Sequence, residues 1–227
     1  ETIRHSLSHI MAYAVKELFP GVKFGIGPAI ENGFYYDLSA EALAEADLPK
    51  IEAKMRELIR QKLALKKKTV SKIAAKKLFK GQPYKLELIK ELPGKTATTY
   101  TTGEFLDLCS GPHVKSTEEI PVDGFKLTKM AGAYWKGSEK NAMLTRIYGL
   151  AFKTKKELDD YLLLQQEAEK RDHRILGQKL GLFVFSDLVG KGLPLFTENG
   201  SIIRRELERF VIDEEIKRGY MHVYTPD

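Results

Sequence analysis

The sequence predicts an α+β protein in which helices pack against an antiparallel sheet and a charged helix leads to a second, shorter part. Three observations predict this fold class. Apolar residues recur at helical spacing between Ile3 and Leu18, short alternating segments begin at Lys95, and residues 155–176 form a charged stretch with loosely periodic apolar positions. A charged helix of that kind typically connects domains.

The first expected element is a helix from Ile3 to Leu18, which Pro20 and Gly21 end. His5 and His9 lie beside its apolar stripe. Helical side chains four residues apart stand one turn from each other and point the same way. The two imidazoles can therefore hold one ion or one water molecule.

Extended and helical patterns alternate after this helix. Lys23–Asp37 is expected to be extended, with a hairpin turn at Asn32–Gly33 that enters an aromatic strand. Glu41–Leu63 is expected to be a helix with Pro49 near the first turn of its main part. A shorter helix is expected over Ser71–Phe79, capped by its first residue.

Strands are expected from Lys95 onward, where β-branched and aromatic residues lie between turn signals. In Phe105–Cys109 the period of two places Asp107 and Cys109 on one face of a strand. Gly111–Pro112 then bends the chain and sets His113 near the end of that strand. The other expected strands are Thr96–Tyr100, Phe125–Met130 and Met143–Tyr148.

The last part of the chain is expected to contain two helices and a strand. Lys155–Leu176 is the charged connector, and Gly200–Arg218 is an amphipathic helix that Gly219 ends. Met221–Thr225 is expected to be a strand. Because Glu1 is not an initiator methionine and nothing after this strand closes a domain, we expect the chain to be part of a longer one.

The composition excludes several classes of protein. Apolar residues make up 43% and charged residues 30% of the 227, which is typical of a globular protein and not of a disordered one. No apolar run reaches the roughly 20 residues that span a bilayer, and no secretory signal is evident. The single cysteine excludes an internal disulfide. We therefore expect a cytoplasmic protein without membrane association.

The excess of basic residues, which gives a net charge of +6, is concentrated in one segment. Between Leu58 and Leu86 there is no acidic residue. A polyanion would be attracted to such a surface, but a solvated basic face explains it equally well. The basic residues of this segment are Arg60, Lys62, Lys66, Lys67, Lys68, Lys72, Lys76, Lys77, Lys80 and Lys85.

Two short motifs carry the strongest chemical signal. They are His-x-x-x-His, formed by His5 and His9, and Cys-x-x-x-His, formed by Cys109 and His113. Three of the five histidines and the only cysteine therefore fall in two motifs, which indicates one site. The residues alone leave four alternatives open: a zinc that activates water, a closed structural zinc, a metal-free acid–base cluster, or four unrelated residues. A zinc peptidase is disfavoured because no His-Glu-x-x-His is present.

Four further residues are candidates with competing interpretations. Asp107 either orients a histidine or is an exposed strand acid. Lys85 either binds a phosphate or stabilises an anionic intermediate, or, more in keeping with a lone lysine, points into solvent. Tyr36 is favoured as a core residue. Trp135 either offers a stacking surface for a base or is a buried aromatic.

These motifs, with several other short segments, resemble those of the threonyl-tRNA synthetase family over essentially the whole chain. The paired His and Cys motifs are also similar to the editing domain of alanyl-tRNA synthetases and its free-standing relatives. The segments that carry the resemblance are Arg4-His5-Ser6 with His9, Gly27-Pro28, Asn32 to Asp37, Tyr84-Lys85, Asp107 to His113, Ala131 to Trp135, Arg146 to Gly149 and Arg171 to Arg174.

The resemblance implies three parts: an editing (second additional) domain over residues 1–155, a linker helix over 156–176, and the beginning of a class II catalytic domain over 177–227. The last part would hold the helix and strand of motif 1, through which the intact enzyme forms a homodimer. The ATP site and the catalytic zinc of the intact threonine–tRNA ligase would lie elsewhere, so this chain is not expected to aminoacylate tRNA.

The resemblance also implies a hydrolytic site for proofreading, which would remove serine wrongly attached to threonine tRNA at the tRNA acceptor end. Alternatives are a module that binds the acceptor arm around a structural zinc, and a hydrolase of alanyl-tRNA or another ester. The alanyl relatives bind zinc at the positions that match His5, His9, Cys109 and His113, which makes these four residues a candidate metal site here. The residues implied in catalysis are His5, His9, Lys85, Asp107, Cys109 and His113, and the candidate substrate-binding residues are Gly27, Tyr36 and Trp135.

Overall fold

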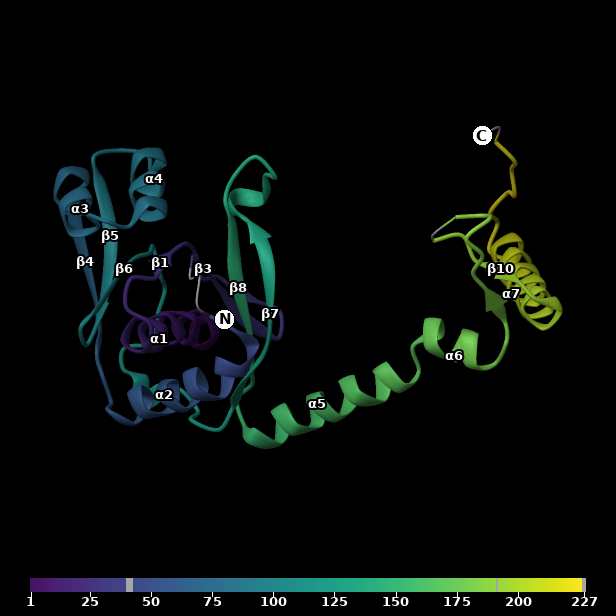
Figure 1. Ribbon diagram of the computed structural model, residues 1–227, viewed down its shortest axis with the longest axis horizontal. Coiled ribbons are helices and arrows are strands. Elements are labelled where there is room, and N and C mark those ends of the chain that lie inside the picture. Colours follow the sequence, from purple (N-terminus) through teal and green to yellow (C-terminus); the bar gives the residue numbers. More distant parts are fainter. Residues whose placement is uncertain (40–42, 191, 226–227) are drawn as a thin grey trace. The chain divides into compact units, whose positions relative to one another are not determined.

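A computed structural model describes residues 1–39, 43–190 and 192–225 of the chain (Figure 1). It divides into two compact units, Glu1–Asp160 and Tyr161–Asp227. Helices and antiparallel strands occur in both, so the predicted α+β class is confirmed. No helix in the described ranges is long and apolar enough to cross a membrane.

A five-stranded antiparallel sheet forms the centre of the first unit. Its strand order is β1-β3-β8-β7, and β2 pairs with β3. The register between β7 and β8 shifts between Leu127 and Lys129, which marks an irregularity in β7. The strands are β1 (Lys23–Phe24), β2 (Ala29–Ile30), β3 (Gly33–Ser39), β7 (Phe125–Tyr134) and β8 (Met143–Ala151).

The main hydrophobic core lies between this sheet and the helices α1 (Thr2–Leu18) and α2 (Leu48–Arg60). Phe34 and Tyr36 of β3 are buried in the same core as Ile10 and Met11 of α1. The predicted first helix is therefore confirmed. Pro49 lies in the first turn of α2, as predicted, and a 3₁₀ turn, Glu45–Asp47, precedes this helix. The start predicted for it, at Glu41, lies outside the described residues.

The predicted hairpin turn is displaced by one residue. Ile30 pairs with Gly33, so the connecting residues are Glu31 and Asn32, and Gly33 belongs to the strand. A Cβ atom on Gly33 would lie 2.0 Å from the carbonyl oxygen of Gly149 on the neighbouring strand. The glycine therefore permits close strand approach instead of forming the turn.

A second sheet of three antiparallel strands completes this unit. It has the order β4 (Leu65–Ser71), β5 (Thr96–Thr102) and β6 (Phe105–Leu108). The helices α3 (Lys72–Leu78) and α4 (Pro83–Glu91) lie at one end of β4 and β5 in Figure 1. The Ser71 side chain accepts a hydrogen bond from the Ala74 amide, so the predicted cap is confirmed.

The predicted alternation along β6 is also confirmed. Leu106 and Leu108 pack against a small core between the sheet and α3 and α4, while Phe105 and Asp107 are buried on the opposite face, toward α1. Short 3₁₀ turns follow at Thr117–Glu119 and Trp135–Gly137.

From Lys155 onward the structure differs from the prediction in two respects. The expected single helix Lys155–Leu176 is two helices, α5 (Lys155–Lys170) and α6 (His173–Lys179), because the Asp172 carboxylate caps α6 by accepting from the Arg174 amide at 2.8 Å. Met221–Thr225 is not a strand: its side chains are exposed, and no strand of the described residues pairs with it. A strand needs such a partner for its backbone hydrogen bonds.

The remaining elements of the second unit are a short hairpin and a long helix. The hairpin pairs β9 (Phe183–Val184) with β10 (Leu195–Phe196). Helix α7 (Glu198–Lys217) begins two residues before its predicted start, because Thr197 caps it. Gly219 follows with a positive φ of 90°, which is consistent with its predicted role as the end signal.

Candidate functional site

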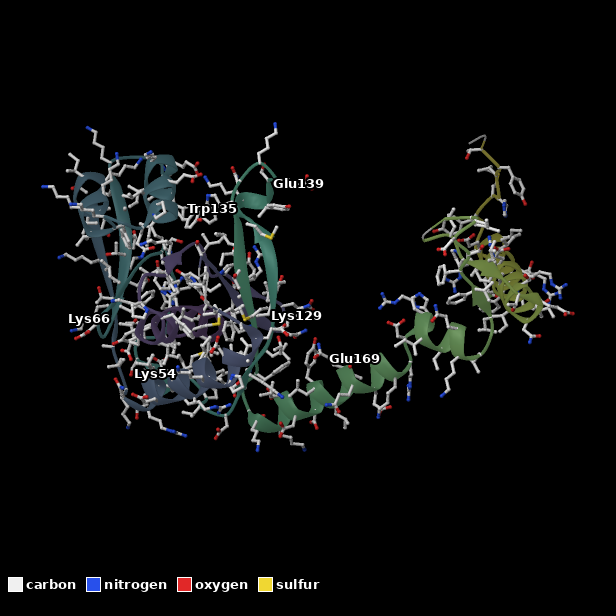
Figure 2. The ribbon with its side chains drawn as sticks, in the orientation of Figure 1. Lys54, Lys66, Lys129, Trp135, Glu139 and Glu169 are labelled. Carbon is white, nitrogen blue, oxygen red and sulfur yellow. The ribbon has the colours of Figure 1, made fainter. Side chains whose placement is uncertain are left out.

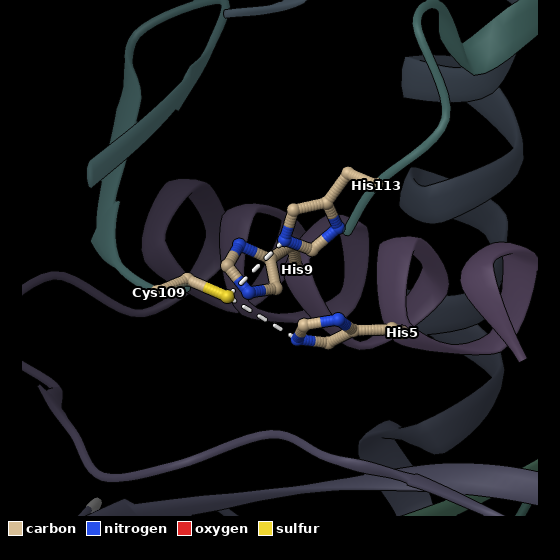
Figure 3. A group of neighbouring side chains, drawn as sticks. All are labelled: His5, His9, Cys109 and His113. Carbon is tan, nitrogen blue, oxygen red and sulfur yellow. Dashed lines mark hydrogen bonds between the residues drawn. The ribbon is translucent and has the colours of Figure 1, made fainter. Parts of the chain in front are cut away.

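The two histidine and cysteine motifs meet in the folded chain. His5 and His9 project from one face of α1, and Cys109 and His113 come from the segment that follows β6. Figure 3 shows the four side chains converging on a common centre. One donor atom from each residue lies within 4.8 Å of the others, so the four form a single cluster, called the quartet below.

Local geometry explains how Cys109 and His113 face the same way across a bend. Gly111 has a φ of 80°, a conformation that side chains other than glycine rarely adopt. A Cβ atom there would also lie 2.3 Å from the Tyr100 hydroxyl. Glycine is therefore required at the bend that returns His113 to the end of β6.

Two imidazoles have their outer nitrogen held by a fixed acceptor. His5 Nδ1 lies 3.1 Å from the Pro112 carbonyl oxygen, which can only accept, so this nitrogen carries the proton. The Ser6 hydroxyl donates to the Thr2 carbonyl oxygen and therefore accepts from His113 Nδ1, at 3.1 Å. Both rings consequently turn an unprotonated Nε2 toward the centre of the quartet.

The two Nε2 atoms share one thiol. Each lies 3.3 Å from Cys109 Sγ, which has a single proton to donate. One nitrogen lone pair thus remains available for a water proton or a cation. Such orientation by outer hydrogen bonds is typical of metal-binding histidines, so the donor set fits a tetrahedral zinc ion as well as a water molecule.

A buried charged network lies beside the quartet. Lys85 and Asp107 form an ion pair although their residues are only 2% and 1% exposed. Tyr36 joins them: its hydroxyl donates to Asp107 Oδ2 at 2.5 Å and accepts from Lys85 Nζ at 2.9 Å. Asp107 also accepts from the Leu108 amide at 2.7 Å, and its Oδ2 lies 3.6 Å from His9 Nδ1. The solvent-exposed interpretations of Lys85 and Asp107 are therefore wrong, and the core position of Tyr36 is confirmed.

Burial keeps the quartet uncharged near neutral pH. It lowers the pKa of His5, lowers that of His9 well below its usual range, and lowers that of His113 to about 2. Burial also raises the pKa of the Cys109 thiol. The histidines therefore offer lone pairs, and the cysteine remains a thiol in the absence of a metal.

The quartet opens onto a cavity of about 700 Å³. Its lining includes His5, His9, Lys85, Asp107 and Cys109. A drug-sized or nucleoside-sized ligand needs a volume in this range.

Gly27 also lines this cavity and lies directly against Tyr36. A Cβ atom on Gly27 would lie 2.2 Å from the Tyr36 ring. The Ser8 hydroxyl contacts the Gly27 carbonyl oxygen at 2.5 Å and so ties this wall to α1. The structure therefore brings Gly27 and Tyr36 together beside the quartet.

Trp135 lies apart from this cavity lining. Its indole is buried, packs against Tyr84 and donates to Glu87 at 3.0 Å. This burial agrees with the structural interpretation of Trp135, and its proposed contact with substrate stays a prediction. The side chain is labelled in Figure 2.

Three residues that contact the site were not singled out from the sequence. Ser6 and Ser8 lie between the two histidines of the first motif, and Tyr100 packs its ring 4.5 Å from that of His113. Serine and tyrosine are also common at positions without a function, so the residue types gave no signal. Only the alternation of side chains along the strand could have indicated that Tyr100 faces the site.

The chain is similar to known proteins at two levels, a domain and the whole sequence. Residues 97–148 match the family model described as the threonyl and alanyl tRNA synthetase second additional domain. This range contains Asp107, Cys109 and His113, but not the two histidines of α1 or Lys85.

Curated relatives match along the whole chain. Threonine–tRNA ligase of Gloeobacter violaceus is 52% identical over 99% of this chain and 36% of the relative. The ligases of Anoxybacillus flavithermus and a Geobacillus species are 50% and 51% identical over 100% of this chain, and 36% and 35% of the relatives. The chain thus spans about a third of the length of these relatives. With half of its residues identical to such ligases from end to end and the matching domain model within it, the chain belongs to the threonyl-tRNA synthetase family.

Proposed function

We propose that the first unit hydrolyses the ester that links serine to the terminal adenosine of threonine tRNA. The observation that carries this proposal is the meeting of the quartet with the Lys85–Asp107–Tyr36 network at one cavity. The cavity would receive the terminal nucleoside with its attached amino acid. The family of the chain supplies the class of substrate.

A separate hydrolytic site is needed because a single binding pocket discriminates poorly between two amino acids that differ by one methyl group. Serine lacks one methyl group of threonine, and a pocket built for the larger amino acid rejects the smaller one only about 10–200-fold. A second pocket can exclude threonine by steric clash and admit serine. Proofreading at this cavity would thus supply the specificity that a synthetic site cannot.

The roles proposed for the side chains follow from their protonation. Neutral His5 lines the cavity, and its Nε2 would accept a proton from water as the water oxygen attacks the ester carbonyl carbon. The Lys85 ammonium would stabilise the negative charge that develops on the carbonyl oxygen. The ester C–O bond then breaks, and the proton passes to the ribose oxygen. Asp107 and Tyr36 would fix Lys85 and hold the amino group or the ribose.

A metal is compatible with the same residues. His5, His9, Cys109 and His113 could hold a zinc ion; with one of the four standing off from the metal, the ion would lower the pKa of a bound water and polarise the carbonyl. In that case His5 would be a ligand and not the base, while Pro112 and Ser6 would still orient the His5 and His113 rings from outside, with Asp107 Oδ2 3.6 Å from His9 Nδ1.

The division of the chain is proposed on the same basis. Residues 1–155 would form the editing domain, and 177–227, with α7, the beginning of a class II catalytic domain whose motif 1 helps to form a homodimer. Since the helix breaks near Asp172, the proposed linker over 156–176 would comprise most of α5 and the first part of α6. ATP and a catalytic zinc would bind other parts of a full-length enzyme.

Deacylation of matched substrates tests this function. The 227-residue chain should hydrolyse seryl-tRNA faster than threonyl-tRNA. His5→Ala and Lys85→Met should each lower kcat at least about 100-fold, as expected for loss of a general base or an electrostatic stabiliser. Lys90→Ala, a change at an exposed lysine of the same helix as Lys85, should retain the rate. Full activity in both site variants, each verified as folded by circular dichroism, would eliminate the mechanism.

A binding module is the second candidate. It is favoured by the outer hydrogen bonds of His5 and His113, because a closed structural zinc would use the same orientation of the two rings. This alternative predicts salt-dependent binding of the tRNA acceptor arm without deacylation. The same assay therefore separates the two.

A further inference from the structure

The side chains of β4 and β5 that share a face with Asp107 form a polar strip beside the cavity. Cross-strand partners point to the same face of a sheet, and Lys67 pairs with Tyr100, which pairs with Asp107. Thr69 pairs with Thr98, and Ser71 with Thr96. We call this set the strip; its members are Lys67, Thr69, Ser71, Thr96, Thr98 and Tyr100.

The strip is continuous with the candidate site. Thr96 and Thr98 line the cavity itself. Tyr100 packs against His113, and its hydroxyl lies at the Gly111 bend. Lys67 is two strands from Asp107, about 10 Å across the sheet. Its ammonium is among the charges that oppose the effect of burial on the pKa of Cys109, so its field reaches the quartet.

The chemistry of the strip suits a phosphodiester. It offers one ammonium and several hydroxyl groups and contains no carboxylate, while the nearby Asp107 is already paired with Lys85. Lysine, serine, threonine and tyrosine are the side chains that commonly contact nucleic-acid phosphates. Lys67 is exposed and, among the interactions described for this chain, enters no salt bridge.

We propose that Lys67, supported by the hydroxyl groups of the strip, binds the RNA backbone phosphate that precedes the terminal nucleoside held in the cavity. The inference rests on the proposed function and adds to it a residue that recognises RNA and not the amino acid. It also distinguishes among the lysines of the basic segment: Lys67 would contact RNA at the site, whereas its neighbours Lys66 and Lys68 would not.

Strand alternation supplies matched controls. Lys66 and Lys68 are exposed and carry the same charge, but they project from the opposite face of β4, which the strip does not include. Lys66, labelled in Figure 2, lies on the edge strand of the sheet. Replacing any of the three lysines removes one charge from the same strand, and only Lys67→Ala removes it from the strip.

The test compares two esters that differ in their phosphates. With an RNA hairpin carrying serine at its single-stranded 3′ end, Lys67→Ala should raise KM roughly fivefold to tenfold and leave kcat unchanged, whereas Lys66→Ala and Lys68→Ala should each change KM less than about twofold. With serine esterified to adenosine alone, all three variants should match the wild type. Lys67→Arg should restore KM on RNA. Equal effects of the three lysines, or an effect of Lys67→Ala on the adenosine ester, would refute the proposal.

A binding measurement separates this inference from the proposed function. Fluorescence anisotropy with the uncharged hairpin requires no hydrolysis. Lys67→Ala should weaken binding and lower the slope of log affinity against log salt by about one, as expected for one lost phosphate contact. Wild-type binding by Lys67→Ala would overturn the assignment even if deacylation occurs. A chain that binds through Lys67 but hydrolyses neither ester would refute only the proposed function.

Discussion

A single hydroxyl determines which nitrogen of His113 faces the quartet. Ser6 Oγ accepts from His113 Nδ1 and from the Val114 amide while donating to Thr2. Its residue is fully buried, so no solvent replaces these bonds. The protonation pattern of the site thus depends on a residue that does not line the cavity.

Ser6→Ala should therefore disturb the tautomer as well as the stability. The two orphaned N–H groups should lower the free energy of unfolding by about 1–3 kcal/mol. In ¹⁵N NMR the His113 ring should be the Nδ1–H form in the wild type and a mixture in the variant, with a parallel loss of deacylation. Ser8→Ala is the control for the His113 spectrum, because among the described residues the Ser8 hydroxyl bonds to the His5 and Gly27 carbonyl oxygens and not to His113. An unchanged His113 spectrum in Ser6→Ala would contradict the argument.

At the scale of the elements, backbone hydrogen bonds hold the loop between β1 and β2 against the site. Gly25 and Ile26 exchange backbone hydrogen bonds with Asp37 of β3, and this places Gly27 over the Tyr36 ring. Tyr36 cannot move freely, because its hydroxyl joins Lys85 and Asp107. The loop, β3 and the buried ion pair are thus in contact with one another, so that displacing the loop would also displace Tyr36 and its hydrogen-bond partners.

Gly27→Ala should consequently reduce activity more than the addition of a single methyl group suggests. The new methyl group would overlap the Tyr36 ring, so either the loop or the ring must shift; overpacking of this kind costs about 1–3 kcal/mol. We expect a lower melting temperature and slower deacylation. Gly132→Ala provides the control, because its Cβ would meet only the flexible, exposed Met143 side chain. Wild-type activity in Gly27→Ala would show that the loop tolerates displacement.

The sequence predicts those features of this structure that depend on residues close together in the chain, and it fails for those that depend on distant residues. The face shared by Asp107 and Cys109, the Ser71 cap and the pairing of His5 with His9 follow from the periods of strand and helix, which are local. The burial of Lys85 depends on partners distant in the sequence, Tyr36 of β3 and Asp107 of β6, and no local pattern encodes those partners. The expected strand at Met221–Thr225 failed for the same reason: pairing is a tertiary property.

At the scale of the whole molecule, the candidate site belongs to one unit. The quartet, the Lys85 network and the strip all fall within Glu1–Asp160. Three neutral imidazoles in one unit, that of His9 buried and those of His5 and His113 half-buried, make its stability a function of pH. Their common direction of pKa change means that their effects on folding reinforce one another.

Without metal, the chain should lose stability as the pH falls below about 6.5. The pKa of His113 falls from its ordinary 6.5 to about 2 on folding, so between these values the unfolded chain binds more protons and acid favours unfolding. His113 alone should contribute up to about 2 kcal/mol of lost stability at pH 5 relative to pH 7. His5 and His9 act in the same direction. Urea unfolding at pH 7, 6 and 5 in the presence of a chelator measures the effect.

Two variants assign this pH dependence to the quartet. His113→Asn should be less stable than the wild type at pH 7 but should lose less stability on acidification, because one proton-uptake site of the unfolded chain is gone. His222→Asn removes an exposed histidine outside the first unit and should leave the profile unchanged. Parallel profiles for wild type and His113→Asn would mean that the imidazole is protonated equally in both states. The neutral, lone-pair-bearing form on which water activation depends would then not be the resting state of the site.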